Sequence, residues 1–195
     1  MIWRRRSVTI AGTCASCAAI RELVHAARRK GDVVVMAFHA GLEGAAGAHV
    51  PRGADYGTNT RAATHAAIDA GADVVFGSGP HVVRGVERYR GRYIVYSSGN
   101  FAGYRNFAIG GLTAQSGVVR MTFDSAGIPT AAAWDGVVLE GPGTPRPDRS
   151  GTVVRRVAAL SNADFGRYPR APIRTRAPGP VPARVWRPAR STRSA

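Results

Sequence analysis

The chain has 195 residues, 45% of them hydrophobic, which is enough to bury the core of one domain without disulfides. Its formal net charge of +15 is concentrated at the ends: residues 142–195 carry +10, whereas residues 7–141 carry only +2. We therefore expect no specific nucleic-acid surface on the folded part. No apolar run is long enough to predict a transmembrane segment, and no signal sequence follows Met1, so the chain as written is expected to be cytoplasmic.

The first half of the chain predicts alternating strands and helices. Strands are predicted where short apolar runs occur, and helices where apolar residues recur at helical spacing. In chain order these are strand 7–12, helix 15–30, strand 32–38, helix 59–70 and strand 73–76. Asn59 is placed to cap the second helix, and Gly71 to end it. This alternation predicts parallel β-α-β crossovers.

The second half predicts antiparallel hairpins instead. One hairpin is formed by 82–88 and 93–97, and another by 117–124 and 130–139. Residues 1–141 would then form one mixed α/β unit. Residues 142–167 are predicted to be a linker that includes a helix at about 150–161. Residues 168–195, rich in Arg and Pro, are predicted to be a disordered basic tail.

Polar side chains follow three strands that are predicted to be neighbours. His39 and Glu43 follow the 32–38 strand, His81 follows the 73–76 strand, and Asn100 follows the strand near 93–97. Parallel strands bring their following loops to one edge of the sheet, where ligands bind. Imidazole and carboxylate together are common ligands of divalent transition metals. Each residue taken alone is more typical of a structural or solvated role, and only their joint placement predicts a polar site.

Several other reactive side chains have ambiguous roles. Cys14 and Cys17 form a C-x-x-C pair, which either is a redox motif or simply opens the first helix. His25 is expected on the surface, and His49 has no partner nearby in the sequence. His65 lies in the middle of a predicted helix and either faces the site or packs on the core.

The segment from residue 32 to residue 101 resembles the CapA family of poly-γ-glutamate capsule-biosynthesis proteins, and a weaker match spans 7–124. The family's H-x-G-x-E occurs as His39, Gly41 and Glu43. Its G-x-x-P-H-V occurs as Gly77, Pro80, His81 and Val82, and its Y-S-x-G-N-F as Tyr96, Ser97, Gly99, Asn100 and Phe101. The resemblance implies a metallophosphoesterase-like α/β fold with a mixed sheet layered with helices.

The resemblance also implies roles for individual residues. His39, Glu43 and His81 would be metal-binding and catalytic residues, with Mn, Fe or Zn as the divalent ion. The residues that would organise this site are Gly41, Gly77, Pro80 and Asn100. Many family members have a histidine where this chain has Gly79. The family's opening Gly-Asp and Asn-Leu-Glu segments are also missing before Ser7. We therefore expect a fold that is incomplete at the N-terminus and a metal that binds weakly or not at all.

The resemblance links the chain to capsule biosynthesis, acting on a γ-linked glutamyl polymer or a phosphoester. Whether this chain is an active enzyme stays open at this point. One alternative is an active metal-dependent phosphoesterase or hydrolase with another substrate. A second is a non-catalytic module whose basic tail binds polyanions. Family members are often membrane-associated or exported. We also expect self-association through an exposed sheet edge.

Overall fold

The candidate site lies on a five-stranded sheet in the computed structural model, which describes residues 7–12, 16–55, 57–105 and 109–166. The strand order is β1-β2-β3-β5-β4. The strands are β1 (Ser7–Gly12), β2 (Val33–His39), β3 (Val74–Ser78), β4 (Val86–Tyr89) and β5 (Arg92–Val95). The first four strands in this order are parallel, and β4 is antiparallel to β5. The predicted β-α-β crossovers and the first hairpin are therefore confirmed.

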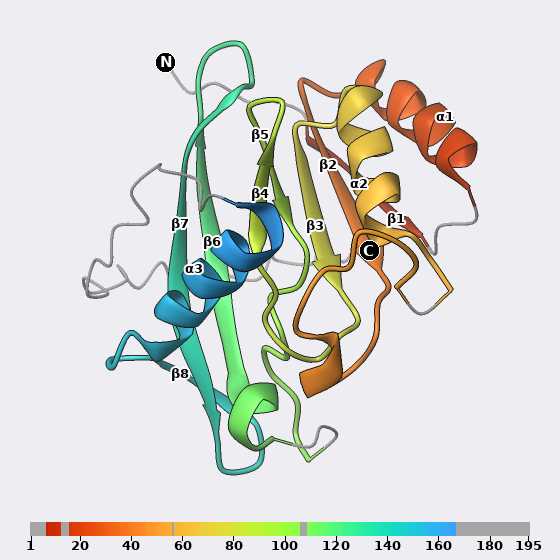
Figure 1. The fold of residues 1–195 in the computed structure, drawn as a ribbon. Helices are drawn as coiled ribbons and strands as arrows, with labels where there is room; N and C mark the ends of the chain where they lie inside the picture. Colours follow the sequence, from red (N-terminus) through yellow and green to blue (C-terminus); the bar gives the residue numbers. More distant parts are fainter. Residues whose placement is uncertain (1–6, 13–15, 56, 106–108, 167–195) are drawn as a thin grey trace, which may run out of the picture.

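Two helices cover one face of this sheet, as Figure 1 shows. They are α1 (Cys17–Arg28) and α2 (Thr60–Asp69), and they pack together with one face of β2, β3 and β5 in one apolar core. Asn59 caps α2, because its side-chain oxygen accepts a hydrogen bond from the Ala62 amide at 2.9 Å. The cap predicted from the sequence is thus present.

The opposite face packs against a second sheet and a third helix (Figure 1). This sheet contains β6 (Gln115–Phe123), β7 (Pro129–Glu140) and β8 (Thr144–Pro147), in that order, and is antiparallel. Helix α3 (Thr152–Phe165) buries its apolar side between β7 and β4. Neighbouring residues of β3 and β5 therefore point into different cores, as expected for strands that are buried on both faces.

The segment 142–167, which was predicted to be a linker with one helix, is more ordered than predicted over its described residues. Residues 144–147 form β8 on the edge of the second sheet, and α3 begins and ends later than predicted. Val86 donates its amide hydrogen to the Ser161 hydroxyl at 2.8 Å, so α3 is tied directly to the first sheet. The sequence did not predict β8 because this short Pro-rich strand depends on a tertiary contact: it pairs only because β7 extends beside it. The predicted disordered tail lies outside the described residues.

Candidate functional site

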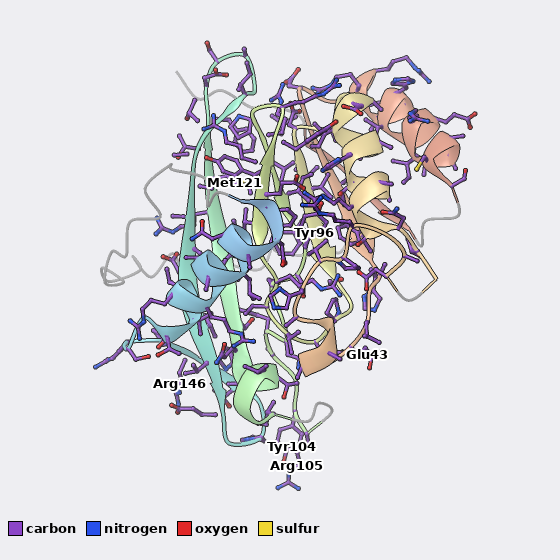
Figure 2. The ribbon with its side chains drawn as sticks, viewed as in Figure 1. Glu43, Tyr96, Tyr104, Arg105, Met121 and Arg146 are labelled. Carbon is purple, nitrogen blue, oxygen red and sulfur yellow. The ribbon has the colours of Figure 1, made fainter. Side chains whose placement is uncertain are left out.

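Three polar segments meet at the edge of the sheet where the parallel strands end. His39 is the last residue of β2 and lies opposite Ser78, the last residue of β3. His81 follows three residues after Ser78, and Asn100 follows β5. Glu43 lies on the loop after β2, at the end of the molecule toward which the β3 arrow points (Figures 1 and 2). These segments thus lie at one edge as predicted, and the metal-binding and catalytic roles of His39, Glu43 and His81 stay predictions.

His81 is held in a defined orientation by Asn100. The Nδ1 atom of His81 lies 2.6 Å from Oδ1 of Asn100, while the Nδ2 of Asn100 donates to the carbonyl oxygen of Thr113 at 3.2 Å. This second bond assigns the amide orientation, so the oxygen that faces His81 can only accept a hydrogen bond. His81 must therefore carry a proton on Nδ1. In the neutral imidazole the lone pair is then on Nε2.

The backbone of His81 adopts a conformation that is uncommon for a residue with a side chain. Its φ angle is 59°, in the left-handed region. Such conformations cost free energy and persist only where the surrounding contacts impose them. Together with the bond to Asn100, this conformation indicates that the ring of His81 is placed by its surroundings.

Glu43 faces the other nitrogen of the same ring. Its Oε1 lies 3.9 Å from Nε2 of His81, and the side chains are 75% and 35% exposed, respectively. A pair this open to water adds little to stability. The pair does place a carboxylate and an imidazole, both partly exposed, at the same point of the sheet edge.

His39 contacts Ser78 rather than Glu43 or His81. The Ser78 hydroxyl donates to the carbonyl oxygen of Phe38 at 3.2 Å and faces Nδ1 of His39 at 3.1 Å. When the hydroxyl donates to Phe38, its oxygen can accept a hydrogen bond from His39. Sequence reasoning did not single out Ser78, although its position directly after the 73–76 strand was a usable signal.

Gly77 and Pro80, which were predicted to organise the site, and Gly79 between them all make close contacts. A Cβ atom on Gly77 would lie 2.4 Å from Cζ of Phe38. Gly79 has a φ angle of 121°, and a Cβ atom there would lie 2.9 Å from the backbone nitrogen of Ala40. The carbonyl oxygen of Pro80 accepts a hydrogen bond from the Gly44 amide at 2.8 Å. The backbone at position 79 thus suits glycine.

Sequence reasoning missed a buried ion pair beneath the site. Arg84 is fully buried, and its Nη1 lies 2.6 Å from Oδ2 of Asp55, whose side chain is 2% exposed. Burial alone would raise the pKa of Asp55, but hydrogen bonds from Arg84, the Leu42 amide and the Thr60 hydroxyl, with the charge of Arg84, hold that pKa below its ordinary value. The only sequence signal was an arginine inside the otherwise apolar run that follows His81.

The remaining histidines lie elsewhere. His25 is exposed on α1. His49 contacts Asp164 of α3, with 2.7 Å between Nδ1 and Oδ1. His65 stacks on Tyr89 and contacts Glu87 through Nε2 at 2.9 Å, so it faces β4 and not the site. Of the cysteine pair, Cys17 is half-buried on α1 and Cys14 lies outside the described residues.

A metal ion needs more donors than this edge brings together. In the part of the chain that the structure describes, no three His, Cys, Asp or Glu side chains are grouped closely enough to hold one ion. His81 and Glu43 form a pair, and His39 is bonded to Ser78. The described residues therefore do not fit a complete metal centre. The predictions of a divalent ion and of its weak binding stay predictions. Among the described helices, none has the length and apolar character needed to cross a membrane.

The fold and the site thus define a mixed α/β protein with a polar site at the carboxyl edge of a largely parallel sheet. Residues 4–105, just over half of the chain, match the model of the family described as "Bacterial capsule synthesis protein PGA_cap". The chain belongs to this family. The matched residues include every residue of the His39–Glu43 and His81–Asn100 segments, and the resemblance to CapA proteins is confirmed.

Individual relatives match over shorter stretches. The "PGA biosynthesis protein CapA" of Bacillus subtilis (strain 168) is 35% identical over 79 residues, which are 40% of this chain and 19% of that protein. The "Uncharacterized protein y4sH" of Sinorhizobium fredii (strain NBRC 101917 / NGR234) is 62% identical over 34 residues, 17% of this chain and 7% of that protein. The chain thus spans no more than about a fifth of the length of these relatives.

Two solved structures are similar to parts of the chain. A hypothetical protein from Thermus thermophilus has a TM-score of 0.43 at 17% identity, over 67% of this chain and 56% of that one. A putative 5'-nucleotidase from Staphylococcus aureus has a TM-score of 0.47 at 14% identity, over 80% of this chain and 32% of that one. Both likenesses are too distant to carry an argument about the site, so the metallophosphoesterase-like fold stays a prediction.

Proposed function

We propose that this chain takes part in poly-γ-glutamate capsule biosynthesis through a metallophosphatase-like site on His39, Glu43 and His81, for which the described residues supply an incomplete set of metal donors. The observation that carries the proposal is the family match, because it covers all three residues and Asn100. The geometry adds support: Asn100 orients the ring of His81, and Glu43 lies at its other nitrogen. The substrate class would be a γ-linked glutamyl polymer or a phosphoester linked to its assembly.

The test is genetic and uses the whole gene. Deletion of the gene from its host should lower the amount of γ-linked glutamyl polymer, and the intact gene should restore it. A gene encoding His81→Ala should restore it poorly, whereas one encoding His25→Ala, on the exposed side of α1, should restore it fully. Polymer that is unchanged after deletion would rule out the proposed role.

A second candidate is an active metal-dependent phosphoesterase or hydrolase with another substrate. The accessibility of Glu43 and His81 to solvent favours it, because a substrate could reach both side chains. This candidate predicts hydrolysis of a generic aryl phosphate in the presence of manganese, with loss of activity in His81→Ala. Turnover that is identical in the His81→Ala and unaltered proteins would reject it.

A further inference from the structure

We propose that the buried Arg84–Asp55 ion pair is a positioning clamp that holds Glu43 against His81. Neither side chain is among the predicted site residues, and neither reaches the exposed edge. Arg84 lies three residues after His81, and Asp55 lies on the long loop after Glu43. The pair therefore joins the two segments that carry the candidate reactive groups. The inference rests on the proposed function only in treating Glu43 and His81 as partners.

The clamp contacts the chain before and after Glu43. The amide of Leu42, the preceding residue, donates to Oδ1 of Asp55 at 2.9 Å, and Leu42 accepts a long hydrogen bond from Arg84 at 3.4 Å. Arg84 also donates to the carbonyl oxygen of Gly47 at 2.6 Å, beyond Glu43 in the same loop. Both backbone groups of Leu42 are thus bonded to the ion pair.

A separate bond fixes the residue directly after Glu43. The amide of Gly44 donates to the carbonyl oxygen of Pro80, the residue before His81, at 2.8 Å. Glu43 is therefore held between two anchor points, the Arg84–Asp55 pair and the carbonyl group of Pro80, and Arg84 and Pro80 both belong to the segment that carries His81. An open ion pair of this kind is weakly held by its own attraction, so these backbone bonds are well placed to keep Glu43 near His81.

Gly41 explains how the guanidinium group can lie under the loop. A Cβ atom at position 41 would lie 2.7 Å from Nη1 and 2.9 Å from Nη2 of Arg84. The loop can pass over the planar guanidinium group only because no side chain is present there. The glycine of the His39–Gly41–Glu43 motif therefore serves the clamp. Lysine could not replace Arg84, because one ammonium group cannot reach Gly47 and both oxygens of Asp55.

The experiment measures the contact between Glu43 and His81 by NMR at one fixed pH. In the otherwise unaltered chain, Glu43→Gln should shift the imidazole signals of His81. With Asp55→Asn in the background, the same change should no longer shift them. The matched control is Asp73→Asn. Asp73 is also 2% exposed, is also paired with arginine and also accepts a backbone amide, that of Val34, but it lies at the far end of the sheet.

Hydrogen exchange separates positioning from overall stability. Asp55→Asn should accelerate exchange at the Leu42 and Gly44 amides by about tenfold more than it accelerates exchange in the core, and Asp73→Asn should not. Equal behaviour of the two variants would overturn the clamp. So would a His81 shift that survives in the Asp55→Asn background. If Asp55→Asn does not fold, Arg84→Lys is the second variant, with the same expected loss of the shift.

The two proposals fail in different ways. If Glu43→Gln leaves the His81 signals unchanged in the otherwise unaltered chain, the two side chains do not interact, and the proposed site is wrong. If the signals shift there and also shift in the Asp55→Asn background, the site stands and the clamp is wrong.

Discussion

The substitution Arg84→Met should strongly destabilise the protein. The change leaves the carboxylate of Asp55 buried, with hydrogen bonds from Leu42 and Thr60 but no positive charge. Breaking a buried ion pair by removing one partner costs about 3–5 kcal/mol. A domain of this size has a free energy of unfolding of about 5–15 kcal/mol, so the variant should fold but with a small margin. The expected fall in Tm is about 6–20 °C.

The pH dependence identifies the cause of this loss. In the unaltered protein the pKa of Asp55 is lowered, so its stabilising effect is present above the ordinary pKa of a carboxyl group and is lost as the pH falls through the lower, folded value. Without Arg84, burial dominates and raises the pKa of Asp55. The folded variant then takes up a proton more readily than the unfolded chain. The difference in unfolding free energy between the unaltered protein and Arg84→Met should therefore be largest near pH 7 and should shrink on acidification.

Urea denaturation at pH 7 and at pH 4 measures both effects. Arg88→Met is the control, because Arg88 is exposed on β4 and should cost no more than about 0.5–1 kcal/mol. The double variant Arg84→Met/Asp55→Asn should lose less unfolding free energy than the two single variants together, because the unpaired charge is gone. A loss below about 1 kcal/mol, or a loss that does not change with pH, would refute the reasoning.

Three further variants test separate parts of the structure. Gly79→His, which introduces the histidine expected from the family resemblance, should cost about 1–3 kcal/mol and add no metal affinity, because φ is 121° and the new Cβ would crowd Ala40. Thermal unfolding measures the loss of stability, and calorimetry measures the metal affinity. Asn100→Leu should lower the fraction of His81 protonated on Nδ1, as read from imidazole 15N shifts; an unchanged tautomer would contradict the assignment. Asp148→Ala should cost about 1 kcal/mol in urea denaturation, because its carboxylate accepts a backbone amide in the first turn of α3; a neutral change would argue against capping.

The sequence was sufficient where a local pattern decides the structure. The apolar runs before His39 and Gly77 identified β2 and β3, and Asn59 identified the start of α2, because strand burial and helix capping depend on neighbouring residues. The meeting of these segments at one edge also followed from the sequence, since the carboxyl ends of parallel strands share an edge.

The features that the sequence did not predict depend on contacts between residues that are distant in the chain. His49 had no partner in its own loop because the partner, Asp164, lies 115 residues away on α3. Arg84 and Asp55 are 29 residues apart, and no periodicity or motif connects them. Strand β8 was missed because proline lowers strand propensity, and an edge strand tolerates it only when a partner strand is beside it.

We propose that the carboxyl edge of the sheet carries a metallophosphatase-like site in which the described residues supply too few donors to hold an ion tightly. Calorimetric titration of the full chain with manganese and with zinc tests it most directly, with His39→Ala and His81→Ala as the paired variants. We expect neither ion to bind with a sub-micromolar Kd. A sub-micromolar site that disappears in both variants would contradict it, because His39 and His81 would then share a tightly held ion.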